Sequence, residues 1–179
     1  MRTTLFFLLL LQLPALYGQN KKITDIPVYE TSANKTDTST WYKWASEIRV
    51  AIQIADLSTA VDSFHFRLWT DRQAIDIWSP DGRRYFGIIT NFAKRFKVKA
   101  YRKGVFTADK IYSKQVIMDS SVARSMFHYV INETIFSIPS DGKIKGWSQG
   151  FDGVEYIIEC SSKTNYAFIV GVNQSFIIV

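Results

Sequence analysis

The sequence predicts an α+β fold in which an antiparallel sheet of meander and hairpin strands packs with two helices. Two observations carry this prediction. Apolar residues recur at steps of three and four in residues 41–55 and again after residue 119, as they do on one face of a helix. Between and after these segments, apolar and polar residues alternate, as they do along half-buried strands.

Composition limits the chain to one globular domain. Of its 179 residues, 47% are hydrophobic and 21% are charged, which excludes an intrinsically disordered protein and a coiled-coil or collagen-like fibre. Two independent cores would each be too small to offset the chain entropy lost on folding. The single cysteine excludes a disulfide framework and a zinc finger. We therefore predict a single domain over residues 41–179.

The first 18 residues have the order of a secretory signal. Arg2 precedes a short apolar run, and the small residue Gly18 stands where cleavage is expected. The run is too short for a membrane span, so we expect no transmembrane segment after cleavage; an uncleaved anchor is the alternative. Residues 19–40 are polar and rich in Ser and Thr, which predicts a linker or extended arm.

The cysteine count also bears on the compartment. Eukaryotic secreted domains of this size commonly carry paired cysteines, whereas bacterial exported domains often carry none. One unpaired cysteine therefore favours a bacterial exported protein, periplasmic or extracellular. The opposing observation is three Asn-X-Ser/Thr triplets that a eukaryotic secretory pathway could glycosylate. They begin at Asn34, Asn132 and Asn173.

The first helix is expected over residues 41–55, with Ser39 or Thr40 as its N-cap. Its apolar positions fall on one face at three- and four-residue steps, which is typical of an amphipathic helix. They are Trp41, Trp44, Ala45, Ile48, Ala51, Ile52 and Ala55.

A β-hairpin is expected next, because apolar residues alternate with polar or aromatic ones on both sides of Asp71. Placing Trp69 opposite Asp76 and Arg67 opposite Trp78 keeps the Phe, Leu and Ile side chains on one face. A shift by one residue would mix the two faces. The hairpin is therefore apolar on one face and polar-aromatic on the other.

The rest of the chain continues the sheet and adds the second helix. The Ser-Pro-Asp-Gly sequence at residues 79–82 predicts a turn. In the last hairpin Cys160 falls on the apolar face, which predicts a core residue. The further elements are strands over 84–91 and 112–118, a helix after the N-cap Asp119, and a closing hairpin of strands 154–160 and 166–172.

The polar-aromatic face of the first hairpin is the leading candidate for ligand binding. It combines flat rings with a guanidinium and a carboxylate, as a platform for a saccharide or a peptide would. The alternative is that a helix simply covers this face. A glycine-bearing loop over residues 137–153 adds another ring. The residues expected to bind ligand are Arg67, Trp69, Asp76, Trp78 and Trp147, beside His65.

A basic stretch follows the third strand, with six cations and no acid over residues 94–103. It could bind a polyanion such as anionic lipid or acidic polysaccharide. Lysines on an edge strand also oppose aggregation, a role that needs no ligand. No nucleic-acid-binding motif accompanies the charge, so nucleic acid is not expected as a partner. The residues expected to bind a polyanion are Arg95, Lys97, Lys99, Arg102 and Lys103.

The sequence contains no recognisable catalytic or metal-binding motif. Its two histidines, His65 and His128, have no partner at metal-ligand spacing. We therefore expect no metal or cofactor, and a non-enzymatic domain that binds a small molecule, a saccharide or a protein. One alternative is a small hydrolase using Asp141, Asp152 or Glu155 near His65. Another is an envelope-associated structural protein whose basic strand meets an anionic surface.

Overall fold

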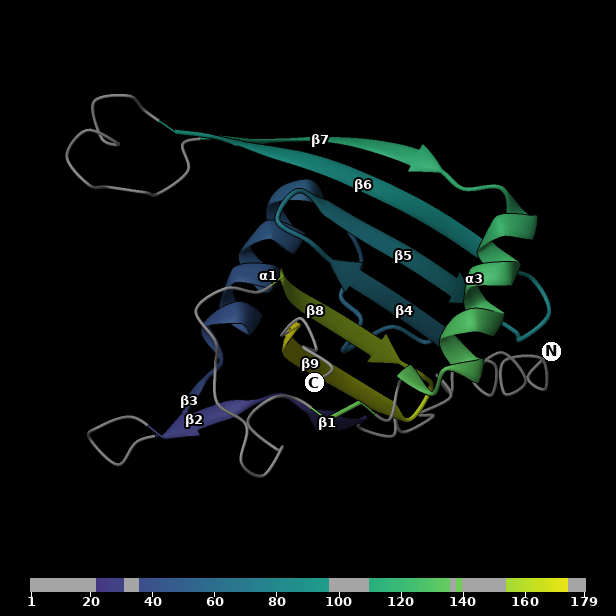
Figure 1. The fold of residues 1–179 in the computed structure, drawn as a ribbon, viewed down its shortest axis with the longest axis horizontal. Helices are drawn as coiled ribbons and strands as arrows, with labels where there is room; N and C mark the ends of the chain where they lie inside the picture. Colours follow the sequence, from purple (N-terminus) through teal and green to yellow (C-terminus); the bar gives the residue numbers. More distant parts are fainter. Residues whose placement is uncertain (1–21, 31–35, 97–109, 136–137, 140–153, 174–179) are drawn as a thin grey trace, which may run out of the picture.

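The computed structural model describes residues 22–30, 36–96, 110–135, 138–139 and 154–173, and these residues form an α+β fold, as the sequence predicts (Figure 1). Two helices pack on a seven-stranded sheet, and a separate two-stranded sheet precedes them. The elements are β1 (Ile23–Asp25), β2 (Val28–Glu30), β3 (Thr36–Thr38), α1 (Thr40–Ile52), β4 (Phe64–Trp69), β5 (Gln73–Ser79), β6 (Phe86–Arg95), β7 (Lys110–Ile117), α3 (Ser120–Asn132), β8 (Val154–Ser161) and β9 (Asn165–Asn173).

The large sheet has the strand order β1-β9-β8-β4-β5-β6-β7, and its strands are antiparallel except for the parallel pair β1–β9. The strand β1 lies in the segment predicted as a linker, so part of that segment belongs to the sheet. The meander β4–β7 and the hairpin β8–β9 are joined along β4 and β8, which places the centre of the sheet at β4.

Both helices begin at the predicted N-caps. The Ser39 hydroxyl accepts a hydrogen bond from the Trp41 amide at 3.2 Å, and the Asp119 carboxylate accepts one from the Ser121 amide at 2.7 Å. Helix α1 ends three residues earlier than expected, because Gln53 adopts a left-handed conformation with φ of 57°. No helix among the described residues is both long enough and apolar enough to cross a membrane.

Side chains alternate between the two faces of the sheet along each strand, so both faces carry apolar side chains. One helix covers each face. Helix α1 packs over a cluster that includes Trp69, Phe92 and Phe168. Helix α3 packs over the opposite cluster, which includes Phe66 and Cys160. The predicted core position of Cys160 is confirmed, since its exposure is 5%. Burial and the neighbouring Glu159 charge raise the pKa of its thiol to about 12, so it is protonated at neutral pH.

The register of the first hairpin differs from the prediction by two residues. Arg67 pairs with Asp76 and Trp69 pairs with Ala74, because a two-residue turn at Asp71 and Arg72 joins the strands. The Thr70 amide closes this turn with a 2.9 Å hydrogen bond to the carbonyl of residue 73. A shift of two residues keeps every side chain on its predicted face, so the two-faced character of the hairpin is retained.

A stability prediction follows from the close approach of β8 and β9. Gly171 lies opposite Tyr156, and a Cβ at Gly171 would overlap the Tyr156 ring. We expect Gly171→Ala to lower the free energy of unfolding by about 1–3 kcal/mol, the usual cost of overpacking. Urea denaturation followed by circular dichroism measures it.

The matched control is the same substitution in a Tyr156→Ala background. Tyr156→Ala removes the three atoms nearest to the added methyl group, so the two substitutions are expected to be non-additive. Equal losses from Gly171→Ala in both backgrounds would show that the ring is not the obstacle.

Candidate ligand-binding site

The polar-aromatic face predicted to bind ligand lies under α1 and the segment that follows it. Arg67 and Trp69 are each 1% exposed and Asp76 is 5% exposed, whereas Trp78 is half-buried. Three of the four side chains are therefore buried rather than displayed on an open platform, as in the alternative in which this face is covered. The physical reason is that these side chains find their partners within the protein, which permits their burial.

Asp76 is the first centre of a buried polar network. Its Oδ1 atom accepts hydrogen bonds from Arg67 Nε at 2.8 Å and from His65 Nε2 at 2.9 Å, and Arg67 Nη2 lies 2.8 Å away. The other ring nitrogen of His65 faces Asp62 Oδ2 at 3.3 Å. Burial alone would raise the pKa of Asp76, but the His65 hydrogen bond and the Arg67 charge outweigh it, so the pKa lies below its usual range.

Glu159 is the second centre of the buried polar network. One of its oxygens accepts from Trp69 Nε1 at 2.6 Å and lies 3.4 Å from Arg67 Nη1, and the other accepts from the Tyr166 hydroxyl at 2.8 Å. Burial, together with this carboxylate, raises the pKa of Tyr166, so its hydroxyl keeps its proton. Arg67 Nη1 also donates to the Ala55 carbonyl at 3.0 Å, which attaches the segment after α1 to the sheet.

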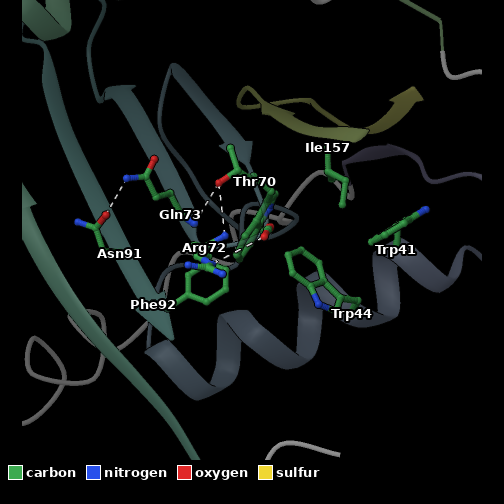
Figure 2. A pocket seen from close by; sticks show the side chains of 10 residues that line it. Trp41, Trp44, Thr70, Arg72, Gln73, Asn91, Phe92 and Ile157 are labelled. Atoms are coloured by element: carbon green, nitrogen blue, oxygen red, sulfur yellow. Dashed lines mark hydrogen bonds and ion pairs between the residues drawn. The ribbon is translucent and has the colours of Figure 1, made fainter. Parts of the chain in front are cut away.

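A large pocket lies beside this network, between α1 and the β4–β5 turn. Its volume is about 860 Å³, within the range of small-molecule sites. Figure 2 shows tryptophan rings from the helix on one side of it and polar side chains from the turn on the other. We call it the aromatic pocket. It is lined by Trp41, Trp44, Trp69, Thr70, Asp71, Arg72, Gln73, Asn91, Phe92 and Ile157.

The aromatic rings of the pocket hold one another at steep angles. Trp44 lies at the centre of the group, 6.1 Å from Trp41, 5.7 Å from Trp69 and 6.3 Å from Phe92 between ring centroids. Edge-to-face contacts of this kind fix ring orientation. The three-residue spacing of Trp41 and Trp44 places both on the same side of α1, where both are half-buried.

The polar side of the pocket is built by the tight turn. Gln73 Nε2 donates to Asn91 Oδ1 at 2.7 Å, which orients both amides. The Thr70 hydroxyl accepts from the Gln73 amide at 3.1 Å and so fixes the turn. The side chain of Arg72 is 85% exposed at the mouth, 3.8 Å from Asp71. Gln73 shares its face of β5 with Ile77, and Asn91 alternates with Phe92, so this amide pair lies on the α3 side of the sheet, away from the rings. Thr70 and Arg72 are the polar residues that border the pocket from the turn.

The structure separates the residues that the sequence placed in one ligand site. Trp69 lines the aromatic pocket, whereas Arg67, Asp76 and Trp78 line a second cavity of about 340 Å³. Trp147 lies outside the described residues. Sequence reasoning assigned Trp41 and Trp44 to the apolar helix face only. Their pairing at a three-residue step was the available signal, but nothing local shows that the β4–β5 turn lies opposite.

The other candidate residues stay mostly untested. Arg95 is exposed at the end of β6, and residues 97–103 lie outside the described part of the chain. Asp141 and Asp152 lie outside it as well, as does the side chain of Glu155. Within the described residues, no group of histidine, cysteine or acidic side chains is arranged to hold a metal ion.

A scan against models of protein families gives no match, and searches of curated proteins and of solved structures give no significant match. The chemistry of the site is therefore argued from its geometry.

The network centred on Glu159 yields a prediction. Glu159→Gln replaces one acceptor oxygen by an NH2 group that faces the donors of Trp69 and Tyr166, and it removes a charge that balances Arg67. We expect the free energy of unfolding to fall by about 3 kcal/mol. Chemical denaturation measures the loss.

The matched control is Glu47→Gln on the exposed side of α1, which is expected to change stability by less than about 0.5 kcal/mol. Equal effects of the two substitutions would contradict the importance assigned to the buried carboxylate.

Asp76 gives the network a pH dependence. The pKa of Asp76 in the folded state lies below the unfolded value of about 3.9. The ionised carboxylate therefore stabilises the fold at pH values above about 3.9, and this stabilisation is lost as the pH falls further and the group becomes protonated. Asp76→Asn should be less stable at neutral pH and should lose less stability between neutral and acidic pH. Thermal unfolding at a series of pH values measures both, and parallel pH profiles for the two proteins would argue against this role.

Proposed function

We propose that the protein is a non-enzymatic domain that binds a neutral saccharide in the aromatic pocket. The observation that carries the proposal is the pairing of half-buried Trp41 and Trp44 with the polar side chains of the turn, across one pocket. The fold alone supports no particular activity, so the argument rests on this arrangement.

The chemistry of a sugar ring matches the two sides of the pocket. One face of a pyranose presents C–H groups, which pack against an aromatic ring, and the hydroxyl groups at its edge need donors and acceptors. Trp44 and Trp41 supply rings, and Thr70 and Arg72 supply a hydroxyl and a guanidinium group. An apolar pocket with a few polar groups that fix orientation is the usual form of a small-molecule site.

The charges near the pocket favour a neutral ligand over an ionic one. Arg72 and Asp71 stand together at the mouth, so both signs are present there. Lys94 Nζ lies 4.9 Å from the centre of the Trp44 ring, where a cation–π contact engages it. No single sign of charge is therefore presented to the ligand by this group of residues.

The proposal includes export from the cell, which rests on the signal-like residues 1–18. An exported domain without a recognised catalytic group meets polysaccharides of the envelope or of the surroundings, which is consistent with saccharide binding.

The test is isothermal titration with soluble neutral hexasaccharides of glucose, mannose and N-acetylglucosamine. We expect at least one to bind, and Trp44→Ala to weaken binding about tenfold or more, since losing a buried ring contact removes roughly 1.5–3 kcal/mol. Trp44 also packs on Trp69, so its removal can weaken binding by disturbing the fold. Arg72→Ala is therefore the second variant. It should keep the fold and weaken binding about fivefold, as for one lost hydrogen bond.

The matched control is Arg83→Ala, an exposed arginine on the β5–β6 connection, which should leave the affinity unchanged. The proposal is overturned if no hexasaccharide binds, or if binding survives both pocket substitutions unaltered.

A further inference from the structure

The second cavity lies on the same face of the sheet as the aromatic pocket, between the segment after α1 and strands β5 to β7. Its volume is about 340 Å³. It is lined by Gln53, Ile54, Ala55, Asp62, His65, Arg67, Asp76, Trp78, Ile88, Thr90 and Gln115. We call it the acidic cavity, because its carboxylates are the groups that the argument below depends on.

Thr90 is the feature that points to a ligand. Its side chain lines the acidic cavity and is 0% exposed, yet its Oγ1 atom has no hydrogen-bond partner among the described residues. Its neighbours across the sheet are Ala74 on β5 and Gln115 on β7. An unsatisfied buried hydroxyl costs about 1–3 kcal/mol, so a ligand atom that pairs with it recovers a cost already present in the fold.

The charges around the cavity select against an anion. Asp62 and Asp76 both line it, on either side of His65. Arg67 cannot serve an anion readily, because its nitrogens already contact Asp76, Glu159 and the Ala55 carbonyl.

Lys22, whose charge interacts with that of Asp62, is also occupied. Lys22 Nζ donates to the Leu57 carbonyl at 3.3 Å and to Ser161 Oγ at 2.6 Å. An anion in the cavity would therefore meet two carboxylates with no uncommitted cation described beside it.

We propose that the acidic cavity binds a small organic ammonium ion. Its N–H groups donate to Thr90 Oγ1 and to the carboxylates, and its positive charge is attracted by Asp62 and Asp76. Trp78, whose ring stacks on His65 and on Phe86, provides apolar surface for the carbon chain together with Ile54 and Ile88.

An ammonium ion suits the site better than a metal ion. Within the described residues no group of side chains is arranged for metal coordination. An ammonium group is held by directed hydrogen bonds, and Thr90 supplies the acceptor that such a group needs.

The test is an NMR titration of the protein with propylammonium chloride, with 1-propanol and sodium propionate as neutral and anionic probes of similar shape. We expect shifts of the amide signals of Thr90 and Gln115 and of the Trp78 indole signal with propylammonium, and much weaker ones with the other two probes. Equal binding of 1-propanol or propionate overturns the proposal, as does the absence of shifts with propylammonium.

Thr90→Val and Thr90→Ser separate binding from folding. Thr90→Val removes the hydroxyl and keeps the shape, so affinity for propylammonium should fall about tenfold while stability stays equal or rises, because an unpaired polar group is removed. Thr90→Ser keeps the hydroxyl and should keep most of the affinity. Unchanged affinity in Thr90→Val overturns the proposal.

The saccharide proposal and this one fail independently. Arg72→Ala alters the aromatic pocket and should leave the propylammonium shifts intact, whereas Thr90→Val should leave saccharide binding intact. Loss of the propylammonium shifts in Arg72→Ala would place the ammonium ion in the aromatic pocket and overturn the assignment to the acidic cavity.

Discussion

The buried guanidinium of Arg67 is the constraint on which the rest of the structure depends. It lies on β4 between Asp76 on β5 and Glu159 on β8, so one charged group joins the meander to the closing hairpin. A guanidinium at 1% exposure is tolerated only with such partners. A shift of either neighbouring strand by two residues would separate the charges, which makes the network a determinant of register.

This charged row also contributes to the acidic cavity, which Arg67 and Asp76 line, whereas Trp69 in the next row lines the aromatic pocket. In the adjacent row, the fully buried Ala74 lies between Trp69, which lines the aromatic pocket, and Thr90, which lines the acidic cavity. The aromatic pocket begins beyond Trp69, and the acidic cavity lies over Thr90.

Local patterns in the sequence predicted what depends on neighbours along the chain. The N-caps Ser39 and Asp119, the two amphipathic helices and the core position of Cys160 all follow from spacing within a few residues. The burial of Arg67 does not, because its partner Glu159 is 92 positions away. The aromatic pocket likewise combines residues from 41 to 157, and a single sequence shows no sign of that meeting.

The position of β4 between β5 and β8 has a consequence for how the chain folds. During synthesis the meander β4–β7 emerges before β8, so one edge of β4 has no partner until the C-terminal hairpin is made. The contact of β1 with β9 spans an even longer stretch of chain. Pairings between distant segments slow folding. Until they form, the unpaired edge of β4 can pair with other chains and aggregate. We therefore expect the sheet to be completed only after the whole chain has been released.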